Sequence, residues 1–298
     1  MVNAKALAAG AGVVVDRLLG EPDVDLHPLV AFGRLMTAVE RRLYRDHRLA
    51  GTLHAAAGVA VGSAVGHLQR STTISTYLAV GGRSLAEAAT AVGVALAAGD
   101  LDAARHLLPT LVGRDPEGLD AAEVARAVVE SVAENTVDAV VAPVLWAALA
   151  GSPGALGYRA LNTLDAMVGH HSPRYERYGW ASARLDDLAG WLPARITAVV
   201  VAAARPEAAR WVLHAVRHQA PDHPSPNGGV VEAAFATALG LRLGGTNHYG
   251  GRIEHRPFLG YGRPAAPGDI DRAVRLSLDV GVLLATTLAT AALVTPRS

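Results

Sequence analysis

The sequence predicts an all-α fold, a polytopic helical membrane protein, and three observations lead to this prediction. Apolar stretches rich in alanine and glycine recur along the 298 residues. Charged residues make up only 18% of the chain, below the roughly 25% usual in soluble domains. Alternating runs of β-branched and aromatic residues, which would indicate strands, are nearly absent. The alternative is a large soluble all-α protein with buried alanine-rich helices.

We expect a single helical membrane domain over residues 1–298. A membrane span needs about 20 apolar residues. The candidate segments lie near 2–19, 49–70, 139–158, 191–204 and 276–295. Their many small residues suit closely packed membrane helices. Six arginines between Asp16 and Leu49 indicate a cytoplasmic loop, while the number and orientation of the spans stay open.

Composition excludes several kinds of function. The formal net charge is zero, so the basic footprint of a nucleic-acid-binding protein is missing and no nucleic-acid partner is expected. Cysteine is absent, which rules out disulfides, thiolate catalysis and cysteine-based zinc sites.

Between Arg83 and Arg126 the pattern indicates amphipathic helices. Gly99-Asp100 predicts a turn, and Asp120 followed three residues later by Glu123 predicts a capped helix start. This new helix carries the first group of candidate functional residues.

Three acids, Glu130, Glu134 and Asp138, recur at every fourth residue of that helix, with no basic residue between them. At this spacing they share one face. Exposure to lipid would cost about 2.5–3.5 kcal/mol for each charge at mid-bilayer, so the face must be hydrated. Carboxylates in such places commonly hold Mg²⁺ together with a polyphosphate. An ordinary solvated helix face is the alternative.

A second group lies between Ala160 and Thr197. Asn162 and Asp165 are three residues apart and face the same way on a helix. Asp186 and Asp187 are adjacent, so only one of the two is expected to point inward. A helix N-cap with a neighbouring acid is the competing interpretation of this pair.

A third group runs from His223 to Gly245, where two prolines and two glycines lead directly into an amphipathic helix. Free N–H groups at a helix start suit an anion, although a plain loop capped by Asn227 is the competing interpretation. Downstream, a stretch rich in glycine and proline is expected to be a loop placed to close over a phosphorylated ligand. Its polar candidates are Tyr249, Arg252, Arg256 and Arg263.

Taken in order, these segments make the sequence resemble the membrane-bound adenosylcobinamide-phosphate synthase family of cobalamin (vitamin B12) biosynthesis. The resemblance covers nearly the whole chain. Glu21 stands where the family usually has aspartate, and the region 51–83 looks shorter than the usual paired hydrophobic segments. The matching motifs are D-R-L-L-G-E-P with H-P (Asp16–Pro28), R-D-P-E-G-L (Arg114–Leu119), E-S-V-A-E-N-T-V-D-A-V-V-A-P (Glu130–Pro143), Y-R-A-L-N-T-L-D-A-M-V-G (Tyr158–Gly169), R-L-D-D-L-A-G-W-L-P-A-R (Arg184–Arg195), S-P-N-G-G (Ser225–Gly229) and R-L-G-G (Arg242–Gly245).

The resemblance implies an acid–amine ligase that joins adenosylcobyric acid to (R)-1-amino-2-propanol or its O-phosphate. ATP and magnesium are the implied cofactors, and the corrinoid and the aminopropanol (phosphate) are the substrates. The implied location is the cell membrane, with several passes, a bilayer partner and a site facing the cytoplasm. A homo-oligomer or docking of other corrin-pathway membrane enzymes is left open.

For that reaction, the candidate residues are expected to fill three kinds of role. One acid or His27 is expected to deprotonate the amine. The catalytic candidates are Glu130, Glu134, Asp138, Asp186, Asp187 and His27; the substrate- and phosphate-binding candidates are Asn162, Arg184, Arg195, Ser225, Asn227 and Gly228; the magnesium ligands are expected among Glu130, Glu134, Asp138, Asp165 and Asp186.

Two other functions remain as alternatives. A Mg²⁺-dependent membrane prenyl or alcohol-phosphate transferase would also carry aspartates on membrane helices. A corrinoid-binding or transport protein would need no catalytic acid.

Overall fold

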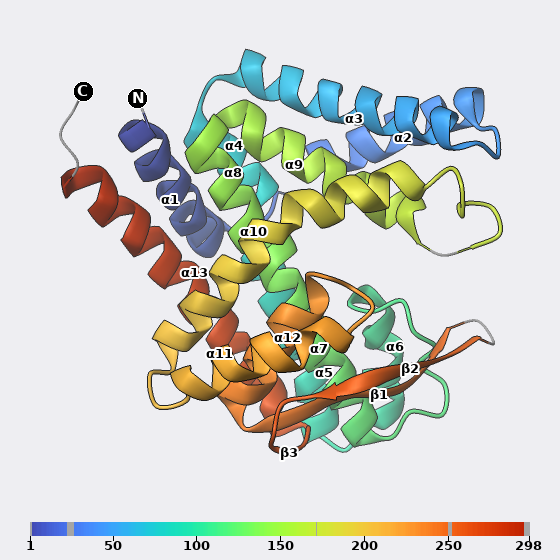
Figure 1. The fold of residues 1–298 in the computed structure, drawn as a ribbon, viewed down its shortest axis with the longest axis vertical. Coiled ribbons are helices and arrows are strands. Elements are labelled where there is room, and N and C mark those ends of the chain that lie inside the picture. Colours follow the sequence, from blue (N-terminus) through green and yellow to red (C-terminus); the bar gives the residue numbers. More distant parts are fainter. Residues whose placement is uncertain (1, 23–26, 171, 250–251, 295–298) are drawn as a thin grey trace. The chain divides into compact units, whose positions relative to one another are not determined.

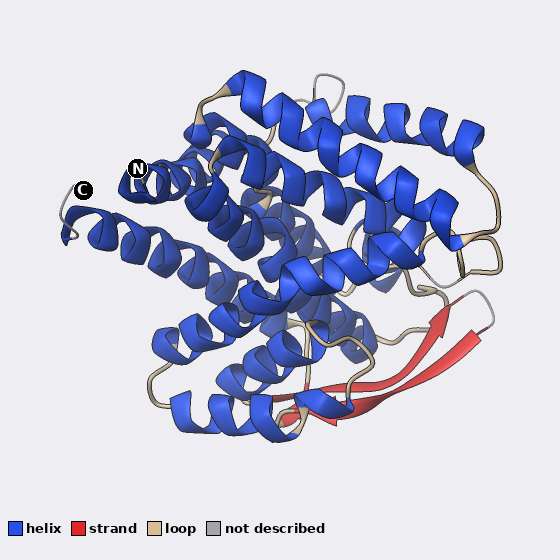
Figure 2. Ribbon diagram, turned by 45° about the horizontal axis from the view of Figure 1, so that its top comes forward, coloured by secondary structure: helices blue, strands red, loops and turns tan. Residues whose placement is uncertain are grey.

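The structure, a computed structural model, describes residues 2–22, 27–170, 172–249 and 252–294. Part of the Asp16–Pro28 motif, residues 23–26, therefore lies outside the described residues. The predicted fold class is confirmed: the residues that the structure describes are mainly helical, and they include one small three-stranded sheet and four helices long and apolar enough to cross a membrane (Figures 1 and 2). The chain divides into two compact units, each assembled from separate parts of the sequence.

Unit 1 contains residues 1–81, 138–192 and 284–298. Helices α3 and α9 pack along each other, because three glycines four residues apart on α3 leave room for the partner. A Cβ atom on Gly58, Gly62 or Gly66 would lie 2.4–2.6 Å from atoms of Leu164, Ala160 and Ser152. The small residues thus allow close packing, as expected for membrane helices. The elements of this unit are α1 (Val2–Leu19), α2 (Pro28–Leu43), α3 (Arg48–Gln69), α4 (Thr72–Ala79), α8 (Ala142–Ala150), α9 (Ser152–Leu164), π-helical turns at Val137–Val141 and Asp165–Gly169, and the first part of α10 (Trp180–Ala204).

Unit 2 contains residues 82–137 and 193–283. As predicted, Asp120 caps α7 in a capping box with Glu123. The elements are α5 (Gly82–Ala97), α6 (Leu101–Leu107), a 3-10 turn (Leu108–Thr110), α7 (Ala121–Thr136), the rest of α10, α11 (Ala209–His218), a 3-10 turn (Ala220–Asp222), α12 (Gly228–Leu239), β1 (Leu241–Tyr249), β2 (Arg252–Leu259), β3 (Arg263–Pro264) and most of α13 (Gly268–Val294).

The expectation that Tyr249, Arg252, Arg256 and Arg263 lie in a loop was wrong, because these residues belong to strands of a sheet of order β2-β1-β3. Strands β1 and β2 pair antiparallel, and the register shifts between Leu243 and Gly245. Gly244 and Gly245 have φ values of +89° and +105°, and a Cβ on Gly244 would lie 2.0 Å from the Pro257 carbonyl oxygen. Glycines at a bulge interrupt the alternation by which a strand is recognised in a sequence.

The four helices that could cross a membrane, by length and composition, differ in part from the expected segments. The segment 139–158 is not one helix, since α8 ends before Gly151, whose φ is +72°. Helix α1, which carries Lys5, Asp16 and Arg17, is not among them. The four are Arg48–Gln69, Ala121–Ala150, Trp180–Ala204 and Gly268–Val294.

Candidate functional site

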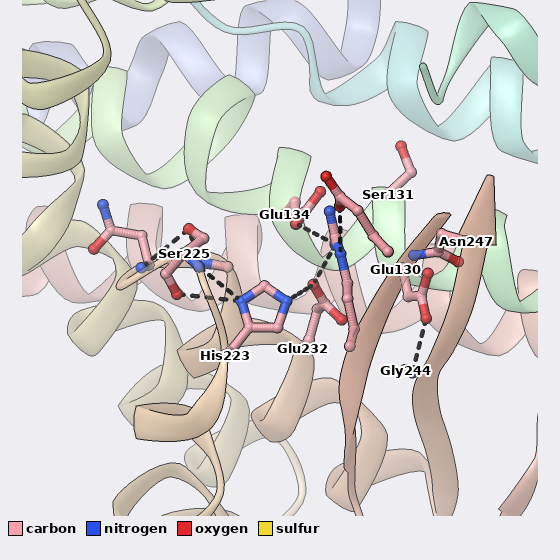
Figure 3. Close-up of polar contacts among 12 residues, drawn as sticks. Glu130, Ser131, Glu134, His223, Ser225, Glu232, Gly244 and Asn247 are labelled. Carbon is pink, nitrogen blue, oxygen red and sulfur yellow. Dashed lines mark hydrogen bonds and ion pairs between the residues drawn. The ribbon is translucent and has the colours of Figure 1, made fainter. Parts of the chain in front are cut away.

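The three acids spaced four residues apart, Glu130, Glu134 and Asp138, form what we call the acid stripe. Its first member, Glu130, lies in unit 2, where it is buried and arginines balance its charge. Arg114 donates to its Oε2 atom, while Arg126 and the Gly244 N–H donate to Oε1 at 3.2 and 2.9 Å. Both arginines also donate to Asn247 Oδ1 at 3.0 Å. The sequence showed no cation between the three acids, but one lies four residues before Glu130 and another comes from the R-D-P-E-G-L motif. Glu130 therefore forms a buried ion pair that fastens β1 to α7 (Figure 3).

The second acid, Glu134, belongs to a mixed cluster between α7, α12 and β2. Arg256 Nη1 lies 3.8 Å from Glu134 Oε1 and 3.6 Å from Glu232 Oε1. His223 Nε2 lies 3.3 Å from the same oxygen of Glu232. Glu134 is 37% exposed, whereas the side chains of Glu232 and His223 are 0% and 1% exposed. Figure 3 shows His223 directed at Glu232, with Glu134 approaching from α7. Glu134 is thus the member of this cluster open to a ligand.

Burial acts against the charged forms of the two buried members of the cluster, Glu232 and His223. Burial, together with the charges of Glu134 and Glu130, raises the pKa of Glu232 well above its usual range, although Arg256 opposes this. Burial lowers the pKa of His223, while its contact with the Ser225 carbonyl raises it. His223 Nδ1 lies 3.1 Å from the Ser225 N–H nitrogen and 3.2 Å from the Ser225 carbonyl oxygen, so Nε2 is the ring nitrogen that faces Glu232.

The Ser225–Gly229 loop forms the start of α12. Ser225 Oγ accepts from the N–H groups of Gly228 (2.9 Å) and Asn227 (3.4 Å) and so caps the helix. Asn227 occupies the N-cap position, but its side chain makes no capping bond and instead accepts from Arg195 Nη1 at 2.9 Å. A Cβ on Gly228 would lie 2.9 Å from Glu134 Oε1. The glycine therefore lets the Glu134 carboxylate approach the positive end of α12.

Unit 1 holds the other predicted acids. Tyr158 donates to Asp138 Oδ1, and Asn162 Nδ2 donates to Asp186 Oδ1, both at 3.4 Å. The charges of both Asp138 and Asp186 act on Tyr158, which places the two aspartates near the same hydroxyl group. Asp138, Asn162 and Asp186 are thus brought together, although they come from three different segments.

Two further aspartates, Asp165 and Asp187, extend this unit 1 cluster. Burial raises the pKa of Asp165 to about 6, and the charge of Asp187 adds to the effect. The Asp165 carboxylate packs against Gly169, where a Cβ would lie 1.8 Å from Oδ1. Arg184 lies 3.5 Å from Asp187 Oδ2, at the edge of the group. Adjacent Asp186 and Asp187 have different partners, since Asp186 accepts from Asn162 and Asp187 lies beside Arg184, and which of the two points inward stays a prediction.

His27 is the N-cap residue of α2, and its Nδ1 atom accepts from the Leu29 N–H at 3.1 Å. Burial lowers the pKa of His27, Glu21 raises it and Arg159 lowers it. A neutral imidazole has the form that a general base needs. Its predicted role as a base stays a prediction.

The acid stripe is therefore divided: Glu130 and Glu134 belong to unit 2, and Asp138 belongs to unit 1. Among the described residues, no group of three or more histidine, aspartate and glutamate side chains is arranged to hold a metal ion. Mg²⁺ is commonly bound by one or two carboxylates plus substrate phosphates, so the predicted magnesium ligands stay predictions.

Sequence analysis missed His223, Glu232 and the partners of Glu130. The sequence does distinguish Glu232, because it is the sole charged residue in the otherwise apolar helix GGVVEAAFATAL. An unpaired acid in a fully buried helix is costly, so its presence indicates a specific partner. Arg114 gave no such signal, since 16 residues separate it from Glu130.

Comparison with known proteins identifies the family. A family model described as CobD/Cbib protein matches residues 9–277. The chain is 47% identical over 286 residues to the cobalamin biosynthesis protein CobD of Mycobacterium tuberculosis (strain ATCC 25618 / H37Rv), covering 92% of this chain and 91% of the relative. The proteins of the same name from Chromobacterium violaceum and Geobacter metallireducens are 46% and 42% identical, with 91% and 87% of both chains covered. No solved structure matches. The motifs, their order and these matches lead to one conclusion: the chain belongs to the CobD/Cbib protein family.

Proposed function

We propose that the chain is an enzyme of cobalamin biosynthesis, an ATP-dependent ligase that joins adenosylcobyric acid to (R)-1-amino-2-propanol or its O-phosphate. The names of the relatives and the motif resemblance support the pathway. The observation that carries the proposal is the start of α12, where Glu134 and Arg256 meet the Ser225–Gly229 loop. This arrangement combines a cation, the positive end of a helix and a partly exposed carboxylate, and groups of these kinds serve phosphoryl transfer.

The reaction requires activation of a carboxylate. A carboxylate oxygen of the corrinoid attacks the γ-phosphorus of ATP, the bond from that phosphorus to the bridging oxygen breaks, and ADP leaves as the acyl phosphate forms. The amine, after losing a proton, then attacks the acyl carbon, and the phosphate leaves as the amide forms. Arg256 is placed to balance negative charge near α12, and Arg195 acts by fixing Asn227 in the loop.

The remaining tasks, which are binding of cations and of the substrate ammonium group, are assigned to acids of both units. Mg²⁺, when bound, would neutralise phosphate charge, and Glu134 in unit 2 suits this role because it is partly exposed. In unit 1, Asp138 and Asp186 with Asn162 offer clustered oxygens that suit either a second cation or the substrate ammonium group. We leave Glu130 out of this proposal, because two arginines already balance its charge.

The test is an assay of the full chain in membranes with adenosylcobyric acid, ATP, Mg²⁺ and each amine separately. We expect ATP-dependent loss of adenosylcobyric acid with stoichiometric ADP release, and the preferred amine identifies the second substrate. Pyrophosphate release from a prenyl donor would favour the transferase alternative. Tight corrinoid binding without turnover would favour a binding or transport protein. We further propose a cell-membrane location with the site on the cytoplasmic side, where ATP is available.

A further inference from the structure

Arg159 in unit 1 carries a charge that the proposed reaction does not use. The residue is partly buried on α9, a helix that packs against α3, α4 and α8 (Figure 1). The Nε–H of its guanidinium group is buried and has no hydrogen-bond acceptor among the described residues. None of the described carboxylates forms an ion pair with it either. A cation enclosed by helices without a counterion is costly, so its presence indicates that a ligand supplies the negative charge.

The neighbours of Arg159 along α9 belong to the unit 1 cluster of acids. Tyr158, the preceding residue, donates to Asp138, and Asn162, three residues further on, donates to Asp186. Residues three apart on a helix lie on the same side of it, with about 5–6 Å between their Cβ atoms. Arg159 therefore lies beside the acids that the proposed function assigns to a cation or to the substrate ammonium group.

The electrostatics of Tyr158 agree with this position. Burial raises the pKa of the Tyr158 hydroxyl, and the charges of Asp138 and Asp186 add to the effect. The charge of Arg159 lowers the same pKa, and it also acts on His27. The arginine and the two acids thus act on one buried hydroxyl group, so positive and negative groups belong to the same site.

Arg184, the arginine of this unit that the sequence pointed to, is placed differently. Its side chain is 67% exposed, and its Nη1 atom lies 3.5 Å from Asp187 Oδ2. Its charge is therefore partly balanced by the protein. In Arg159 only Nε is covered, so a ligand can reach the two Nη groups.

We propose that Arg159 is the oxyanion-binding residue of the unit 1 site and pairs with a phosphate or carboxylate group carried by a substrate. This inference rests on the proposed function. A guanidinium group binds both kinds of anion through charge-assisted hydrogen bonds, often in pairs. Two sources are available in the proposed reaction: the phosphate of the phosphorylated amine and the carboxylate of adenosylcobyric acid.

Steady-state kinetics of the full chain in membranes separate the two sources. Arg159→Gln should raise the KM of the substrate that carries the anion by at least about 10-fold. If that anion is the phosphate, the KM of aminopropanol phosphate rises and the KM of free aminopropanol stays the same. If it is the carboxylate, the KM of adenosylcobyric acid rises with either amine. Arg177→Gln, at a 65% exposed arginine of the same unit, is the matched control and should change no KM.

Arg159→Lys distinguishes anion binding from packing. Lysine keeps the positive charge but loses the planar fork of the guanidinium group. Its KM for the affected substrate should lie between those of the wild type and of Arg159→Gln. Equal KM values in the lysine and glutamine variants, raised for all three substrates alike, would indicate a packing role and overturn the proposal.

Calorimetry without ATP tests the same assignment when no turnover occurs. The full chain in detergent is titrated with aminopropanol phosphate, free aminopropanol and adenosylcobyric acid. We expect Arg159→Gln to weaken binding of one anionic ligand by at least about 10-fold and to leave free aminopropanol unaffected. Such a loss without ATP-dependent product formation by the wild type would contradict the ligase but support the role of Arg159. Equal affinities of Arg159→Gln and the wild type for all three ligands would overturn the role of Arg159 alone. If the wild type binds none of them, both proposals are wrong.

Discussion

The acidic groups of the two units differ in how their charge is balanced. In unit 2, Glu130 is enclosed by Arg114 and Arg126, and Arg256 lies between Glu134 and Glu232. In unit 1, several aspartates gather around Tyr158 and Asn162, while the charge of Arg159 also acts on Tyr158 and Arg184 lies 3.5 Å from Asp187. Arginines thus balance the acids of unit 2 and let them hold the structure of that unit, whereas the site proposed for unit 1 would take its positive charge from a bound cation.

The largest expected effect concerns stability in unit 2. Glu130→Gln leaves two buried arginines without their shared counterion and should lower the free energy of unfolding by about 3–5 kcal/mol. Chemical unfolding of the purified protein in detergent measures it. Asp102→Asn, at an exposed ion pair, is the control and should change stability by less than about 0.5 kcal/mol. In unit 1, Asp186→Asn should leave stability equal or higher, and a loss as large as that of Glu130→Gln would contradict the comparison.

The next effect concerns turnover. Glu134→Gln and Asp186→Asn should each lower turnover by at least about 100-fold, because both are assigned to charge balance in the reaction. Membrane insertion should be unaffected, as measured by the amount of protein in washed membranes. Wild-type turnover in both variants would contradict the roles assigned to Glu134 and Asp186, but it would not affect the membership of the family.

Gly228→Ala tests how closely Glu134 must approach the start of α12. The added Cβ would lie 2.9 Å from Glu134 Oε1, so the carboxylate must move, and turnover should fall by about 10-fold. Stability should change by less than about 1 kcal/mol, because alanine favours a helix more than glycine does. Stability and turnover falling in parallel would indicate a packing defect instead.

The smallest effect is the pH dependence of unit 1. The folded protein holds a proton on Asp165 up to a pH of about 6, whereas the usual pKa is 3.8. Folding therefore binds a proton in this window, and stability should fall as the pH rises from about 4 through 6. Asp165→Asn should flatten that slope in unfolding measurements at several pH values, whereas Asp102→Asn should preserve it. If the free energy of unfolding of Asp165→Asn depends on pH as in the wild type, a group other than Asp165 causes the slope.

The sequence alone determined the helical class, the capping box at Asp120 and the family, because each rests on local pattern or motif order. It also identified most of the acids in both clusters. Only the tertiary structure decided that arginines balance the charge of Glu130, that His223 meets Glu232, that the acid stripe divides between two units, and that β1 and β2 pair antiparallel. The physical reason is common to all four. Ion pairing, burial and strand pairing depend on which distant segments meet, and spacing along one helix says nothing about the residue that approaches from another.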